Sequence, residues 1–153
     1  MYVYDVIEMQ KIPVQISKAK NSDLKPNSIF EFDWRDEREH DVFKLEIKKN
    51  KETLGLISLK IISEELRIEI RLLEIQKANI GKNKRYQKIA GILIGYACKK
   101  AFDLGFFGFV SLIPKTRLRI HYQEKYGFKQ FGRHLAVQLE ESEMIMNKYL
   151  TNE

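Results

Sequence analysis

The chain has 153 residues, of which 44% are hydrophobic and 31% charged, and its formal net charge is +6. These values are typical of one globular domain spanning residues 1–153 and exclude an intrinsically disordered chain. The positive charge favours anionic ligands, such as nucleic acid, an acidic membrane surface or a polyphosphate cofactor.

Residues 1–40 carry little hydrophobic pattern. Tyr2 to Glu8 alternates weakly and predicts an edge strand, whereas Lys18 to Asn27 holds turn-forming residues. The pattern sharpens from Asp41, where three segments of strand length follow one another with short polar connectors. They begin at Val42, Leu54 and Leu66, and end at Ile47, Ile62 and Ile75. Short connectors of this kind join antiparallel neighbours, so we expect a meander.

The second half of the chain predicts helices alternating with strands. Apolar residues at helical spacing predict a long helix from about Tyr86 to Leu104, which Gly105 would end. The continuous apolar run that follows predicts a central strand buried on both faces. The elements predicted after the long helix are a strand over Phe106 to Ile113, a helix over Lys115 to Tyr126 ending at Gly127, strands from Phe128 and over Ala136 to Leu139, and a helix over Glu140 to Leu150. The fold class is α/β, with a mixed, mostly antiparallel central sheet flanked by helices.

The single cysteine, Cys98, excludes an intrachain disulfide framework and a cysteine-rich zinc site, and its apolar neighbours predict a buried side chain. The three histidines, His40, His121 and His134, lack metal-ligand spacing, so we expect no metal. The longest apolar run, Ile89 to Cys98, is half of the roughly 20 residues that span a bilayer. The start of the chain lacks a signal-peptide pattern. We therefore expect a cytoplasmic protein that does not enter membranes.

Four cations crowd the start of the long predicted helix, where the helix dipole disfavours positive charge. They are Lys82, Lys84, Arg85 and Lys88. The segment between Ile75 and Ala101 contains no acidic residue and no serine or threonine to cap the helix. A bound phosphate would satisfy both the free N–H groups of the first turn and these cations. The alternative is a solvated, lysine-rich turn.

Two motifs in this region resemble those of the GNAT superfamily of acyl-CoA-dependent N-acyltransferases. The segment Arg85-Tyr-Gln-Lys88-Ile-Ala90-Gly91 resembles the family's arginine or glutamine, two residues, glycine, one residue, then glycine or alanine. The segment His121-Tyr122-Gln-Glu-Lys-Tyr126-Gly127-Phe128 resembles its later helix, which bears a tyrosine and closes in glycine-phenylalanine. The resemblance covers about Leu66 to Phe128.

The resemblance implies a GNAT-like fold and acetyl-CoA as co-substrate. It implies that the loop opening the long helix holds the pyrophosphate, through Lys84, Arg85, Tyr86, Gln87, Lys88, Ile89, Ala90 and Gly91. Lys88 stands where the family has its first loop glycine, and we expect it to contact a phosphate as a point charge. The strand ending near Ile75 to Lys77 should diverge from its parallel neighbour and pair with the pantetheine amides.

For catalysis, the resemblance implies Tyr122 as the acid or hydrogen-bond donor to the leaving thiolate, and Glu74 as the base, acting directly or through water. The alternatives are a core tyrosine at Tyr122 and a solvent-facing strand residue at Glu74.

The function implied is transfer of an acetyl group to a primary amine of unknown identity. Acidic residues in Glu31 to Asp41, together with Trp34, would suit a cationic acceptor. One alternative is a catalytically degenerate GNAT-fold binding module. The other is a basic nucleic-acid-binding protein that uses Lys82 to Lys88 and Lys115 to Arg119. A homodimer is left open.

Overall fold

The computed structural model describes residues 1–115 and 118–151. Nine strands are assigned in these residues: β1 (Tyr2–Asp5), β2 (Gln10–Lys18), β3 (Asp41–Ile47), β4 (Thr53–Ile62), β5 (Arg67–Ile75), β6 (Tyr86–Gln87), β7 (Val110–Leu112), β8 (Lys129–Phe131) and β9 (His134–Val137). Three α-helices accompany them: α1 (Ile89–Asp103), α2 (Arg119–Tyr126) and α3 (Leu139–Tyr149). None of the described helices is long and apolar enough to cross a membrane.

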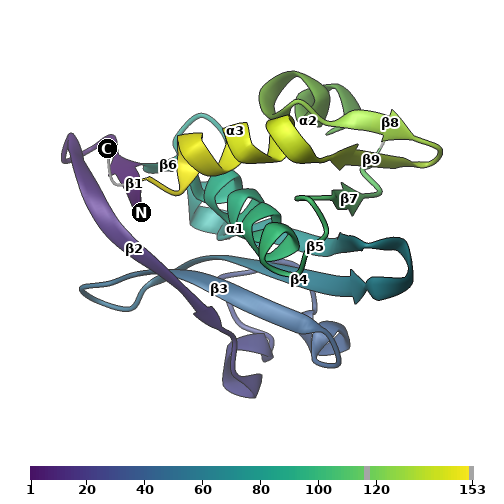
Figure 1. The fold of residues 1–153 in the computed structure, drawn as a ribbon. Coiled ribbons are helices and arrows are strands. Elements are labelled where there is room, and N and C mark those ends of the chain that lie inside the picture. The colour runs from purple at the N-terminus through teal and green to yellow at the C-terminus, as the bar shows by residue number, and fades with distance from the viewer. Residues whose placement is uncertain (116–117, 152–153) are drawn as a thin grey trace.

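The strands form one sheet in the order β6-β1-β2-β3-β4-β5-β7-β9-β8. The β5–β7 pair is parallel, and the other pairs between described strands are antiparallel. Helix α1 packs against one face of this sheet, and α3 crosses over α1 (Figure 1). The predicted mixed, mostly antiparallel α/β fold is therefore confirmed.

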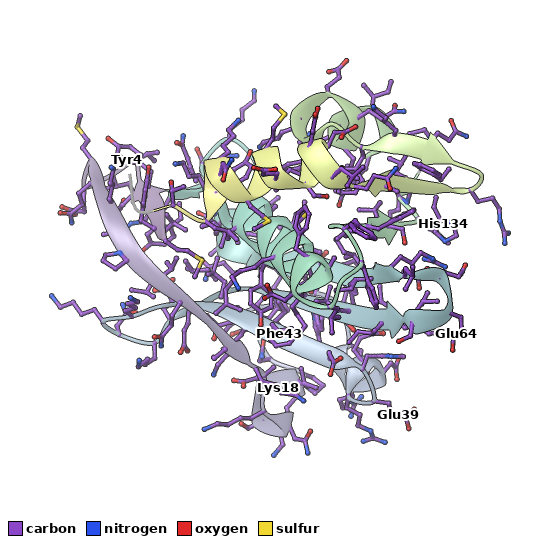
Figure 2. All side chains as sticks on the ribbon, in the orientation of Figure 1. Tyr4, Lys18, Glu39, Phe43, Glu64 and His134 are labelled. Atoms are coloured by element: carbon purple, nitrogen blue, oxygen red, sulfur yellow. The ribbon has the colours of Figure 1, made fainter. Side chains whose placement is uncertain are left out.

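Side chains of the meander alternate between two hydrophobic clusters, one on each face of the sheet. Phe43 points toward α1, and its ring lies 4.9 Å from that of Tyr96 (Figure 2). Its neighbour Val42 points the opposite way and packs with Trp34. Each side chain buried in this manner contributes about 1.5–3 kcal/mol. The segment between β2 and β3 therefore belongs to the core, because its short helices η1 (Asn21–Leu24) and η2 (Trp34–Glu37) cover the face that α1 leaves open.

The meander over β3, β4 and β5 is confirmed, with one irregularity in β5. Ser58 pairs with Leu72, but the next residue, Leu59, pairs with Ile70. Arg71 is therefore an extra residue on β5, a β-bulge that bends the strand. This bulge lies where β5 leaves its parallel partner, because the β5–β7 pairing covers only Ile68 to Ile70.

Several predicted boundaries are wrong for local reasons. Strand β1 is not an edge strand, because β6 pairs with its free side and β2, which the sequence did not reveal, pairs with the other. Helix α1 begins at Ile89 rather than Tyr86, because Tyr86 and Gln87 form β6. Strand β7 is shorter than predicted, since Gly105 and Gly108 have φ of +80° and +72° and turn the chain before it.

The later elements agree with the predictions to within a few residues. The last strand, β9, ends at Val137, and α3 begins at Leu139. Helix α2 begins at Arg119, and its C-cap Gly127 has the predicted left-handed conformation, with φ of +77°. Residues 116–117, which the sequence assigns to this helix, lie outside the described residues.

Candidate functional site

The loop that precedes α1 is held by one buried side chain, Asn79. Its Oδ1 accepts hydrogen bonds of 2.7 Å from the backbone N–H groups of Arg85 and Tyr86. Its Nδ2 donates to the carbonyl oxygen of Tyr86 at 2.8 Å. Pairing of β6 with β1 fixes Tyr86 and Gln87. The loop therefore has a defined conformation before any ligand binds.

The first turn of α1 presents a row of free backbone donors. Lys88, the N-cap, adopts a left-handed conformation with φ of +85°, and no side chain caps the helix. The first helical hydrogen bond runs from the N–H of Ile92 to the carbonyl oxygen of Lys88. Among the described residues, the N–H groups of Lys88, Ile89, Ala90 and Gly91 have no acceptor. Such a row of amides at a helix N-terminus is suited to bind an anion.

The left-handed conformation of Lys88 explains why a glycine would be favoured at this position. Glycine adopts positive φ without steric cost, whereas other residues pay about 1–2 kcal/mol. The Lys88 ammonium donates a 2.9 Å hydrogen bond to the Tyr2 hydroxyl and lies 4.3 Å from the centre of that ring. This hydrogen bond lowers the pKa of Tyr2. The side chain thus lies over β1, and the phosphate contact predicted for it remains a prediction.

The side chain of Arg85 has a structural partner. Its guanidinium contacts the buried carboxylate of Asp5, with Nη2 2.8 Å from Oδ2 and Nε 3.0 Å from Oδ1. Hydrogen bonds from Arg85, opposed by burial, lower the pKa of Asp5. Tyr86 is buried, and Gln87 is exposed. The Arg85 side chain, predicted to bind phosphate, therefore holds the loop against β1.

Three lysines from different elements approach one another near the first turn of α1. Lys84 lies in the preceding loop, Lys125 in the last turn of α2 and Lys148 in the last turn of α3. Burial, followed by the charges of Lys84 and Lys148, lowers the pKa of Lys125. A cluster of lysines that lowers the pKa of one member, Lys125, indicates a place where an anion would be stabilised.

Gly91 brings the ends of α2 and α3 close to this turn. A Cβ atom at Gly91 would lie 2.3 Å from the ring of Tyr149, so only glycine allows this packing. The Tyr149 ring in turn lies 5.9 Å from that of Tyr126, the neighbour of Lys125. Gly91, predicted as a cofactor residue, thus also has a packing role.

A cleft of about 320 Å³ opens where β5 and β7 separate. The described residues that line it come from β5, the end of β7, the residues after it, α2 and the segment before η2; they are Phe32, Ile70, Arg71, Leu72, Leu73, Leu112, Ile113, Pro114, Lys115, Leu118 and Tyr122. The predicted divergence of β5 from its parallel neighbour is therefore present.

The backbone of β5 beyond the bulge faces this cleft at alternate residues. Because the N–H of Gln76 bonds to the carbonyl oxygen of Leu54, the polar groups of Leu73 and Ile75 point away from β4. No described residue pairs with them. The N–H of Lys77 donates instead to the carbonyl oxygen of Ile29, at 2.8 Å. The predicted backbone pairing with a ligand is thus available at Ile75 but not at the Lys77 N–H.

Tyr122 lines the cleft from α2. Its ring contacts Tyr126 and Phe128, with centroids 6.1 and 5.7 Å away. Its hydroxyl makes no hydrogen bond to a described residue, and burial raises its pKa. A protonated phenol that faces a cleft without a partner is able to donate a hydrogen bond to a ligand.

Glu74 is buried, with 6% of its surface exposed, which contradicts the solvent-facing alternative. Its carboxylate accepts hydrogen bonds from the backbone N–H groups of Glu31 and Phe32, at 2.6 and 3.2 Å, and from the Trp34 indole at 2.9 Å. Glu74 is not among the described residues that line the cleft. The carboxylate therefore holds the segment before η2 against the sheet, and its predicted role as a base remains a prediction.

Cys98 is buried as predicted, and burial raises the pKa of its thiol to about 12. The thiolate that a nucleophile requires is therefore not formed at neutral pH.

Sequence reasoning missed Asn79, Arg71, Lys125 and Lys148. Asn79 has no local pattern that distinguishes it from any loop asparagine. Arg71 occupies a bulge, which depends on pairing with β4. Lys125 and Lys148 lie 23 residues apart in sequence and meet only because α2 and α3 converge.

No protein-family model matches this chain, and no curated protein matches it by sequence. Solved structures do match it. A chimera of spermidine N-acetyltransferase SpeG from Vibrio cholerae and hSSAT has a TM-score of 0.58 and 18% identity, covering 90% of this chain and 99% of the other. An IAA acetyltransferase from Bacillus cereus has a TM-score of 0.57 and 15% identity, covering 83% and 100%.

A third match is N-acetylglutamate synthase from Neisseria gonorrhoeae, in a complex with coenzyme A and L-arginine. Its TM-score is 0.59 with 15% identity, and the match covers 83% of this chain but 33% of the other. Matches at sequence identities this low are evidence for the fold alone.

Proposed function

Because this chain has the GNAT fold, we propose that it binds acetyl-CoA and transfers the acetyl group to a primary amine. The observation that carries the proposal is the row of four amides from Lys88 to Gly91, which have no acceptor among the described residues, beside Lys84, Lys125 and Lys148. A pyrophosphate would accept hydrogen bonds from the amides and would neutralise the lysines. The coenzyme A bound in one of the similar structures supports this assignment.

The cleft between β5 and β7 would receive the rest of the coenzyme. The backbone groups of Leu73 and Ile75 point into the gap and lack partners among the described residues. The amides of the pantetheine arm would pair with them as an added strand. The thioester would then lie in the cleft that Tyr122 lines.

The chemistry follows from this placement. The nitrogen of a neutral amine attacks the thioester carbonyl carbon, the C–S bond breaks, and water takes up the proton that the nitrogen loses. The hydroxyl of Tyr122, which is protonated at neutral pH, donates a proton to the leaving sulfur and is reprotonated from water. Arg71 and Lys115 add positive charge to the cleft, which favours the neutral, nucleophilic form of the amine.

Thermal unfolding with excess acetyl-CoA tests the proposal. At about 100 times Kd, the ligand would stabilise the native chain by about 2.7 kcal/mol. For a chain of this size that raises the melting temperature by about 5–10 °C. The double variant Lys84→Glu, Lys125→Glu should lose most of this shift. Arg85 is left intact, because its pairing with Asp5 stabilises the fold.

The matched control is Lys25→Glu, Lys60→Glu. It changes the net charge by the same amount at exposed positions with no ion pair to a described residue. It should keep the full shift. Equal loss in both double variants would mean that only net charge matters, and no shift in the unaltered chain would contradict the proposal.

A further inference from the structure

The cleft between β5 and β7 differs from what a cationic acceptor would require. Of the described residues that line it, none is acidic, and two, Arg71 and Lys115, are cationic. The remaining lining side chains are apolar or aromatic. A polyamine would meet like charges there without a carboxylate to offset them.

Two of the acidic residues expected to serve such an acceptor, Asp33 and Glu37, are engaged elsewhere. Asp33 forms a 2.8 Å ion pair with Arg35, whose hydrogen bonds lower the pKa of Asp33 to about 2. Glu37 is buried, and its Oε1 accepts from the Ser58 hydroxyl at 2.7 Å and from Arg71 Nε at 3.0 Å. Neither these two carboxylates nor the other acidic residues of Glu31 to Asp41 are among the described residues that line the cleft. Recognition of a cationic amine by this segment therefore remains a prediction.

Arg71 is oriented in a way that leaves donors available. Its Nε is held by Glu37, while Nη1 and Nη2 have no acceptor among the described residues. The side chain is 34% exposed, partly screened from solvent. A guanidinium that is already held at one edge has little conformational freedom left to lose when a ligand binds. Its outer edge matches a carboxylate in bidentate geometry.

Lys115 and Phe32 complete this end of the cleft. The Lys115 ammonium lies 5.4 Å from the centre of the Phe32 ring, and it has no ion pair with a described residue. An aromatic wall beside two cations suits a ligand that has an apolar body and an anionic group.

We propose that the amine acceptor is a small apolar amino acid, whose carboxylate binds Arg71 and Lys115 while its side chain packs on Phe32. The proposal rests on the proposed function, because it assigns the acceptor of that same site. Arg71 and Tyr122 line one cleft of about 320 Å³, so one small molecule could place its carboxylate at Arg71 and its amine near the thioester. The carboxylate orients the amine toward the thioester.

Isothermal titration calorimetry of the full chain with L-phenylalanine, 2-phenylethylamine and spermidine tests this, with and without coenzyme A. Phenylalanine should bind about tenfold or more tightly than phenylethylamine, the difference that a charge-assisted bidentate pair makes. Spermidine should bind weakest. Arg71→Lys keeps a charge beside Glu37 but cannot bind bidentately, and should reduce phenylalanine affinity about tenfold without changing that of phenylethylamine.

A second variant guards against misfolding of the first. Lys115→Gln alters an exposed residue and should weaken phenylalanine binding about threefold, as for a partly screened ion pair. Equal affinity for phenylalanine and phenylethylamine, tighter binding of spermidine, or no binding of phenylalanine would each overturn the proposal. A parallel titration with acetyl-CoA separates the two claims: acetyl-CoA binding without phenylalanine binding rejects the acceptor alone, and the reverse rejects the acetyltransferase.

Discussion

Tyr122→Phe should lower kcat about 100-fold, or ~2.7 kcal/mol, with little change in the KM for acetyl-CoA. Tyr122 lines the cleft, and its hydroxyl has no hydrogen bond to a described residue, so its removal would deprive the leaving thiolate of a proton donor and leave the fold intact. Steady-state kinetics, with coenzyme A release as the readout and denaturant unfolding as the check on stability, measure both effects.

Tyr126→Phe is the matched control, because Tyr126 lies one turn further along α2, is buried, and does not line the cleft. Its kcat should equal that of the unaltered chain. A Tyr122→Phe variant that retained more than half of kcat would show that Tyr122 is a packing residue, as the core-tyrosine interpretation holds.

Glu74→Ala should destabilise the chain by about 2–4 kcal/mol, because the Trp34 indole N–H would be left buried without an acceptor. The N–H groups of Glu31 and Phe32 belong to exposed residues, so water would replace the carboxylate there at lower cost. Urea denaturation followed by the fluorescence of Trp34, the single tryptophan, measures the change.

The activity of a Glu74→Gln variant distinguishes two roles of Glu74: holding the segment before η2 in place, and acting as the catalytic base. Glutamine keeps one acceptor oxygen but turns an amide toward an N–H donor, so the segment that carries Phe32 should loosen. A positioning role predicts a raised KM for the amine with kcat within a few fold. A fall of about 100-fold in kcat with KM unchanged would instead restore Glu74 as the base.

The elements that follow local periodicity were predictable. The alternation over β3, β4 and β5 and the apolar stripe of α1 define which side chains face the core, and the structure has them there. The N-terminal pairing was not predictable, because β1 and β6 are short and gain their stability from each other and from the Asp5–Arg85 pair across 80 residues. The start of β7 was not predictable either, since an apolar run does not show where Gly105 and Gly108 turn the chain.

The candidate site also has features that were predictable from the local sequence and features that were not. The excess of cations and lack of caps at the start of α1 are local features, and the free amides from Lys88 to Gly91 agree with them. The assignments of side chains were less reliable, because Arg85, Lys88 and Glu74 could each satisfy their charge with partners that only the fold supplies. The environment of Arg71 depends on a bulge and on η2, neither of which has a sequence signature.

The most direct test of the central claim is a titration of the ¹⁵N-labelled chain with acetyl-CoA, followed by the backbone amide resonances. The amides of Lys88, Ile89, Ala90 and Gly91 should show the largest shift changes, since a phosphate oxygen would become their acceptor. If acetyl-CoA left these four resonances unmoved, or shifted only residues remote from the start of α1, the coenzyme would not bind there and the acetyltransferase proposal would be contradicted.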